Sequence, residues 1–253
     1  MGLRARRRDR AARMGAELFL FERAFADCLE RLALVQRGFR RALLLGCPDP
    51  AWPGRLETAA HDVVVYDPGL LFAEAARGER VIEDAWRPQT NRFDLVFAIG
   101  TLDTVNDLPL ALRLLFEAMT DDALMIGAVA GGDTLPMLRD AMRAADAVAG
   151  GAAPHIHPRI EPSALAPLLS NAGFAMPVVD VDRVNVSYPS LGRLVGDLRR
   201  MGATNVLRER PRRLSRPAYV AAARAFEDSG SERTVETFEI LHFAAWKRPS
   251  LRG

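Results

Sequence analysis

The stretch from Arg41 to Pro50, RALLLGCPDP, constrains the fold more than any other part of this 253-residue chain. An apolar run ends there in a glycine and a turn, and further apolar runs follow with helical patterns between them. Strands that alternate with helices in this way form parallel βαβ units. We therefore expect the stretch to be the first strand and turn of an open α/β sheet, the place where such folds bind nucleotide-like ligands.

The remaining elements follow from apolar periodicity and turn signals. Strands are predicted at residues 61–66, 79–84, 93–99, 123–130, 178–188 and 234–246. Helices are predicted at residues 17–35, 51–60, 108–119, 135–148, 163–172, 189–200 and 217–226. The last two strands flank a helical insertion, which suggests an antiparallel edge hairpin with the insertion folded over the ligand face as a lid.

This pattern divides the chain into four expected segments. They are an N-terminal helical segment, a Rossmann-like cofactor-binding core, a helix and loop insertion, and a segment that completes the sheet and carries the lid. Their ranges are 1–40, 41–130, 131–160 and 161–253, with the lid at about 189–230.

Composition excludes several classes of protein. Hydrophobic residues make up 49% of the chain, enough for a sizeable core, and a net charge of +2 gives no case for a nucleic-acid or membrane partner. The two cysteines, Cys28 and Cys47, are too few for a disulfide framework, so we expect free thiols in a reducing, cytoplasmic setting. No apolar run approaches the roughly 18 residues of a membrane-spanning helix, and the N-terminus lacks a secretory apolar region.

The N-terminus carries six arginines against one acid between Arg4 and Arg13. Such a run could contact nucleic acid or an anionic surface. No aromatic residues that could stack on bases are interleaved with the arginines. The pattern therefore favours a solvated helix or tail.

Two acids follow predicted strands, as the ligand-binding acids of α/β folds do. Asp67 ends the strand 61–66, where a carboxylate can accept hydrogen bonds from the two hydroxyls of a ribose. Asp67 could equally cap the next helix, ahead of Pro68 and Gly69, and the sequence does not decide between these readings. Asp84 stands in the same relation to the strand 79–84.

The loops offer weaker candidates. His155 and His157 form an H-x-H pair that could ligate a metal, but a loop pair without metal is the expected state. Asp133 could face the ligand cleft or cap the helix that follows it. Tyr188, at a strand end under the proposed lid, is a candidate substrate contact, with packing as the alternative.

Several motifs in order carry a family resemblance. They are VNDLPLAL (105–112), GGDTLPMLR (131–139), PHIHP (154–158), AGFAMPVVDVD (172–182), DLRRMGATN (197–205) and TFEILHFAAW (237–246). With the strand order, they resemble a class I S-adenosylmethionine-dependent methyltransferase fold. Within that superfamily, the chain is similar to the complex I assembly factors that act as arginine hydroxylases and to their alphaproteobacterial relatives. The malonyl-carrier-protein methyltransferases are a more distant likeness.

The resemblance implies an enzyme that binds S-adenosylmethionine and hydroxylates an arginine of a respiratory complex I subunit. It places Gly46 at the methionine-binding turn, Asp67 on the ribose and Asp84 near the adenine, with Ile99 as a further cofactor contact. It does not identify a catalytic residue, and Asp103, Asp133 and Tyr188 are the weak candidates. No metal is implied.

The cofactor turn departs from the family pattern. Leu44 stands where the family usually has an acid, and Pro48 and Pro50 stand where it has glycines. Proline offers no N–H, and Asp49 adds a negative charge beside the place of the ligand's carboxylate. Each lost charge-assisted hydrogen bond costs roughly 1.5–3 kcal/mol, so the turn predicts cofactor binding weakened by several powers of ten.

The loop after strand 93–99 also differs. Asp103 and Thr104 replace the family's usual His-Trp pair, and an exposed aspartate would stay ionised where a histidine could act as acid or base. Asn106 and Asp107 are expected to cap the helix that begins at Leu108.

Three hypotheses remain at this level. The first is an S-adenosylmethionine-binding enzyme of the complex I assembly type that modifies a protein side chain. The second is a non-catalytic assembly or partner-binding protein with the same fold. The third is a methyltransferase acting on a small acid or a carrier-bound substrate. The altered turn favours a family member of reduced activity.

Overall fold

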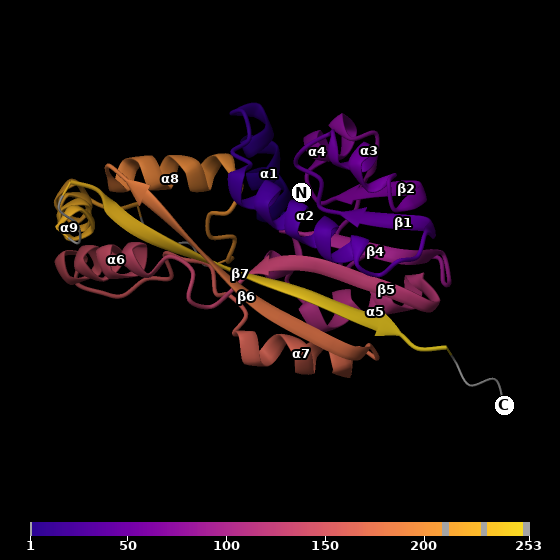
Figure 1. Ribbon diagram of the computed structural model, residues 1–253. Helices are drawn as coiled ribbons and strands as arrows, with labels where there is room; N and C mark the ends of the chain where they lie inside the picture. Colours follow the sequence, from indigo (N-terminus) through magenta and orange to yellow (C-terminus); the bar gives the residue numbers. More distant parts are fainter. Residues whose placement is uncertain (1, 209–212, 229–231, 250–253) are drawn as a thin grey trace.

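Seven strands form one sheet in the order β3-β2-β1-β4-β5-β7-β6 in the computed structural model (Figure 1), which describes residues 2–208, 213–228 and 232–249. The strands are β1 Phe39–Leu45, β2 Ala60–Asp67, β3 Glu79–Arg80, β4 Phe93–Ile99, β5 Met119–Ala130, β6 Ala175–Tyr188 and β7 Thr234–Lys247. The first five strands pair in parallel, and β7 runs antiparallel to both β5 and β6. The predicted α/β sheet with an antiparallel edge hairpin is confirmed.

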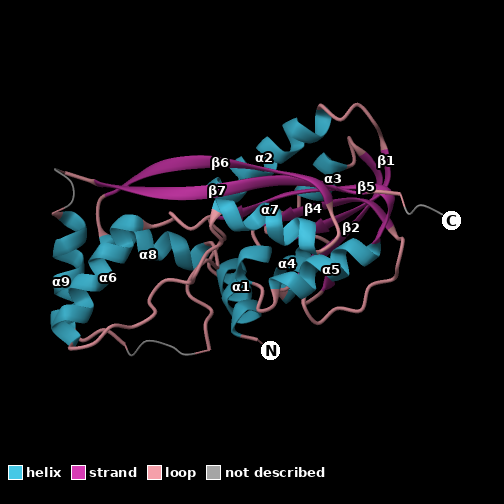
Figure 2. Cartoon of the chain, turned by 90° about the horizontal axis from the view of Figure 1, so that it is seen from below, coloured by secondary structure: helices cyan, strands magenta, loops and turns pink. Residues whose placement is uncertain are grey.

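Helices cover both faces of this sheet (Figure 2). They are α1 Leu3–Arg13, α2 Phe19–Ala33, α3 Trp52–Leu56, α4 Leu70–Ala75, α5 Leu108–Ala118, α6 Pro136–Ala149, α7 Pro162–Asn171, α8 Leu191–Arg200 and α9 Arg216–Glu227, with a 3-10 turn η1 at Leu102–Thr104. Helices α2 and α3 pack on one face, and α5 and α7 pack on the other. Because strands buried on both faces have no polar side, the buried end of β1, residues 42–45, is a continuous apolar run.

Two predicted elements are shorter than expected. Strand β3 contains only two residues, because the chain turns away from the sheet at Ile82, whose carbonyl accepts from the N–H of Ala85 at 3.0 Å. Helix α3 ends at Leu56 because β2 starts at Ala60, which pairs with Phe39 of β1. Both errors concern element ends, where tertiary pairing overrides local preference.

The long β6–β7 hairpin carries a second group of helices (Figure 1). Helices α6, α8 and α9 gather at one end of the hairpin, and the parallel strands lie at the other end. A separate apolar cluster holds this group together and includes Leu194, Phe226 and Phe238. The C-terminal end of α8 reaches the edge of the parallel sheet, whereas α9 packs against α6.

No helix in the described ranges is both long and apolar enough to cross a membrane. Cys28 and Cys47 are buried and free, so the expectation of two unpaired thiols is confirmed.

Acidification is expected to destabilise the fold through His242 in β7. This side chain is buried, with Nδ1 3.1 Å from a carboxylate oxygen of Asp27. Burial lowers the pKa of His242 below its ordinary value of 6.5, against the opposing charge of Asp27. The unfolded chain therefore binds more protons than the folded chain below pH 6.5, so stability falls as the pH drops through that value, by at most about 1.4 kcal/mol per pH unit for one such group.

Chemical denaturation between pH 7.5 and 5 measures this dependence. His242→Gln is expected to reduce the pH slope, whereas His61→Gln, at an exposed position, serves as the matched control. An unchanged slope in His242→Gln would contradict the assignment.

Candidate active site

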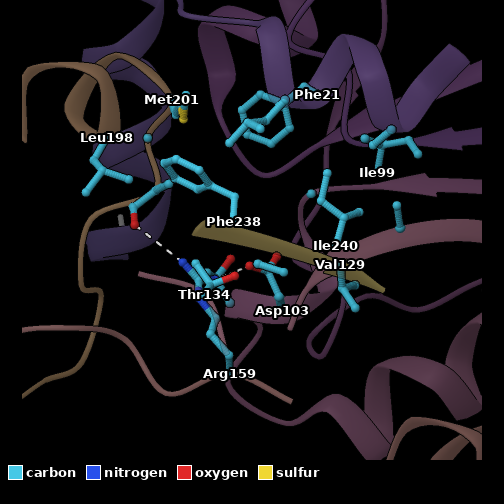
Figure 3. A pocket seen from close by; sticks show the side chains of 18 of the residues that line it. Phe21, Ile99, Asp103, Val129, Thr134, Arg159, Leu198, Met201, Phe238 and Ile240 are labelled. Carbon is cyan, nitrogen blue, oxygen red and sulfur yellow. Dashed lines mark hydrogen bonds and ion pairs between the residues drawn. The ribbon is translucent and has the colours of Figure 1, made fainter. Parts of the chain in front are cut away.

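The candidate site lies at the carboxyl ends of the parallel strands. Here the turn after β1, the end of β2 and the loop after β4 meet helix α1 and the end of α8. A cavity of about 90 Å³ opens between helices α1 and α2, the loop after β4, the ends of β5 and α8, and β7. Figure 3 shows Asp103 and Arg159 together at one side of this cavity, with Phe21, Met201 and Phe238 facing it from elsewhere. Most of the lining is apolar.

Gly46 forms the tight turn that the sequence predicts. Its φ angle is 83°, and a Cβ atom there would lie 2.2 Å from the carbonyl oxygen of Ile99. Only glycine combines this left-handed backbone with such a close approach to β4. Gly46 and Ile99, two of the expected cofactor contacts, are therefore brought together by the fold.

The rest of the turn offers few free donors. Pro48 and Pro50 have no N–H, and the N–H of Cys47 donates to Asp67 Oδ2 at 2.9 Å. Asp49 accepts from the N–H of Ala51 at 2.9 Å, at the start of α3. Leu44, at the family's acid position, is fully buried in the core. Burial and the neighbouring Asp67 raise the pKa of the Cys47 thiol to about 12, so it supplies no thiolate at neutral pH.

Asp67 is buried at the end of β2, and each of its acceptor sites is used inside the protein. Arg8 of α1 donates from Nε at 2.8 Å and from Nη2 at 2.5 Å. The N–H groups of Cys47 and Gly69 donate at 2.9 and 2.7 Å. The alternative reading of Asp67 as a helix cap is wrong, because Asp9 of α1 accepts from Leu71 N–H in the first turn of α4.

Glu83 is the buried acid after β3, where the sequence led us to expect Asp84. Arg4 of α1 donates to its two oxygens at 2.5 and 2.7 Å. Burial alone would raise the pKa of Glu83, but the hydrogen bonds and charge of Arg4 hold it below its ordinary value. Asp84 is only half-buried and accepts from the N–H of Asp107 at 2.9 Å. Val81 and Glu83 are buried and Ile82 is exposed, an arrangement that the apolar pattern of the sequence does not show.

The arginine-rich N-terminus is not the solvated helix that the sequence favoured. It forms α1, whose Arg8 is buried with its guanidinium 5.0 Å from the centre of the Phe72 ring. Asp67 attracts this guanidinium and holds it in place despite the cost of burial, which lowers the pKa of an arginine. The composition showed the positive charge of this segment but not which acids it binds, because Asp67 and Glu83 lie 59 and 79 residues away in the chain.

Asp103 lies in η1 and is not the exposed aspartate that we expected. Its side chain is 8% exposed and forms an ion pair with Arg159, which is 3% exposed. Arg159 also donates to the carbonyl of Ala203 at 3.4 Å, so it joins η1 to the chain after α8. A carboxylate held in this way is a structural counter-ion, and both residues line the cavity.

The other loop candidates lie outside the cavity lining. Asp133 was expected to face the ligand cleft or to cap α6, and it does neither. Its side chain is 70% exposed and pairs with Arg183 at 3.3 Å, away from the cavity lining. The carboxylate that accepts from the first turn of α6 is Glu236 of β7. Tyr188 is buried against Phe238, in agreement with packing. Asp107 caps α5 as predicted, with Leu110 N–H donating at 2.9 Å.

The two histidines of the H-x-H pair have different neighbours. His155 Nε2 lies 2.7 Å from Asp146 Oδ1, and His157 lies in a groove beside Arg159. Burial lowers the pKa of His157. In the described part of the chain, no three His, Cys, Asp or Glu side chains are grouped as metal ligands.

In this arrangement the residues do not fit S-adenosylmethionine. The turn has lost donors to Pro48 and Pro50, and guanidinium groups fill the acceptors of Asp67 and Glu83.

The strand order with antiparallel β7, and a glycine turn after β1, define a class I methyltransferase fold. The chain belongs to the methyltransferase domain family, whose model matches residues 16–177. The crystal structure of the YcgJ protein from Bacillus subtilis shares this fold, with a TM-score of 0.60 at 12% identity, covering 89% of this chain and 100% of that one.

Two groups of curated proteins are similar in sequence. The mitochondrial arginine-hydroxylase NDUFAF5 of Danio rerio is 38% identical over 173 residues, which are 64% of this chain and 54% of that protein. The malonyl-[acyl-carrier protein] O-methyltransferase of Xylella fastidiosa is 33% identical over 156 residues, 60% of this chain and 51% of that protein. The chain therefore aligns with about half the length of these relatives.

Proposed function

We propose that the chain serves the assembly of respiratory complex I by modifying an arginine side chain of one of its protein subunits, with hydroxylation as the reaction and an oxidant from outside the chain as the source of the oxygen atom. The similarity to the arginine hydroxylase supports this role, and one observation in the site carries it further. Three acids near the strand ends, Asp67, Glu83 and Asp103, each bind a guanidinium group of this chain. The acids of this cleft therefore bind guanidinium groups, the side chain that the proposed substrate carries.

S-adenosylmethionine is the cofactor that the family implies, and we propose that it binds weakly. Asp67 and Glu83 would hold its nucleoside half, and Gly46 and Ile99 would adjoin its methionine half. The chain's own residues would contribute acceptors and exclude water.

The second candidate is a non-catalytic partner-binding protein of the same assembly pathway. The lost donors at Pro48 and Pro50 and the filled acceptors of Asp67 favour it. The carrier-protein methyltransferase is a third candidate, supported by the identity to the malonyl-carrier enzyme.

The mass of complex I peptides separates these candidates. Complex I is purified from cells with and without the chain, and arginine-containing peptides are compared by mass spectrometry. The proposed function predicts an arginine that carries an added oxygen only when the chain is present. Failed assembly with no change in any peptide would support the non-catalytic role. Unchanged peptides with normal assembly would overturn both.

A further inference from the structure

Helix α1 presents two arginines to the site from one side. Arg4 and Arg8 are four residues apart, so their side chains leave the same face of the helix. Arg8 forms an ion pair with Asp67 at the end of β2, and Arg4 forms one with Glu83 after β3. Helix α1 also provides Asp9, which accepts from Leu71 N–H, so α1 and α4 are joined by charge and hydrogen bonds.

These contacts fill the part of the cleft that a nucleoside would need. A ribose held at Asp67 must donate its hydroxyls to oxygens that already accept from Arg8, Cys47 and Gly69. Arg8 also lies close against the turn after β2, because a Cβ atom at Gly69 would be 2.8 Å from Cβ of Arg8. The helix and a nucleoside therefore exclude each other at this acid.

Arg4 also bridges the two sides of the cleft. Besides Glu83, it donates to the carbonyl of Thr101 at 2.5 Å and to Thr104 Oγ1 at 2.9 Å, and so links the segments after β3 and β4. The cavity of about 90 Å³ lies on one side of this link, and a groove of about 540 Å³ lies on the other. Both are lined by Arg4, Asp103, Thr104 and Arg159. These side chains divide what would otherwise be a continuous cleft.

The attachment of α1 is polar rather than apolar. Its buried hydrophobic side chains are only Ala5 and Ala11, so little buried apolar area becomes exposed to water when the helix undocks. The segment that follows is anchored beyond the helix, where Glu17 pairs with Arg200 of α8 at 3.0 Å. Between them, Gly15 has a φ angle of 75°, at a bend free of regular structure. Helix α1 can thus leave while α2 stays in place.

We propose that α1 is an internal competitor of the cofactor: Arg4 and Arg8 occupy the nucleoside acceptors, and S-adenosylmethionine binds only when α1 withdraws. The inference rests on the cofactor assigned under the proposed function, but not on the reaction. The acids and the arginines stabilise each other while α1 is docked, because a buried charge without a partner is costly. A cleft that is open in only one molecule of a hundred would weaken apparent affinity about 100-fold.

Calorimetric titration of the full chain with S-adenosylhomocysteine tests the competition. The variant Arg4→Gln/Arg8→Gln is expected to bind at least about tenfold more tightly than the unaltered chain, since α1 then lacks both ion pairs. The control Arg6→Gln/Arg10→Gln removes the same charge from exposed positions of the same helix and is expected to bind like the unaltered chain. A folded Arg4→Gln/Arg8→Gln variant that binds no more tightly would overturn the proposal.

Amide hydrogen exchange measures the undocking of α1 in the unaltered chain, without any variant. S-adenosylhomocysteine is expected to speed exchange of the amides of residues 3–13 as the ligand saturates the site. Saturation with unchanged or slowed exchange in α1 would overturn the proposal. Neither measurement depends on the substrate, so a chain that leaves complex I peptides unmodified can still show the competition, and a chain that modifies them can lack it.

Discussion

Replacing Arg159 with methionine is expected to lower the free energy of unfolding by about 3–5 kcal/mol. The guanidinium of Arg159 and the carboxylate of Asp103 are 3% and 8% exposed, so the substitution leaves an unpaired charge in the interior. The change also removes the hydrogen bond to the carbonyl of Ala203. Urea or guanidinium denaturation at pH 7 measures the loss.

A double substitution distinguishes an unpaired charge from simple loss of packing. Asp103→Leu combined with Arg159→Met removes both charges, and most of the lost stability should return. Arg143→Met is the matched control, because Arg143 and Asp140 are exposed and their pair contributes no more than about 1 kcal/mol. If the double variant were as unstable as Arg159→Met, the ion pair would not be the cause.

Alanine at position 46 is expected to destabilise the chain by about 2–5 kcal/mol. The positive φ angle disfavours any side chain, and the new Cβ would lie 2.2 Å from the carbonyl oxygen of Ile99 and 2.5 Å from Thr101 Cγ2. The clash with Ile99 involves backbone, so β1 and β4 must separate at the edge that carries the candidate site. Thermal and chemical unfolding both report the loss.

Gly54→Ala provides the comparison for this effect. Gly54 lies in α3, and a Cβ there would meet nothing within 4 Å. The same chemical change is expected to stabilise the chain by about 0.4–1 kcal/mol, because alanine has less freedom in the unfolded state. Equal effects at the two positions would contradict the role assigned to the Gly46 turn.

Much of the fold could be predicted because its signals are local. Residues 93–99 were predicted as a strand with the same limits as β4, since a short apolar run between turn signals is typical of a buried strand. Strand β3 was predicted less well, because two residues of pairing to β2 depend on where the chain leaves the sheet. Helix α4 was expected after Gly69 but was given no bounds, and its first turn is capped by Asp9 of α1, which is distant in sequence.

The candidate site was predictable only in part. Gly46 and Asp67 were predicted as cofactor contacts from their places after strands, and the structure brings the turn that contains Gly46 to Asp67 through the N–H of Cys47. Glu83 was missed in favour of Asp84, because two adjacent acids differ only in the face to which they point. Asp103 was expected to be exposed, and its partner Arg159 is 56 residues away.

The sequence alone determined the class of fold and the missing donors in the turn after β1, since strand periodicity, the glycine after β1 and the absence of N–H groups in Pro48 and Pro50 are properties of neighbouring residues. Only the tertiary structure decided what the acids of the site bind. Asp67 and Glu83 receive Arg8 and Arg4 because burial makes an unpaired carboxylate costly, and the nearest cations in space come from a helix 59 and 79 residues away in the chain.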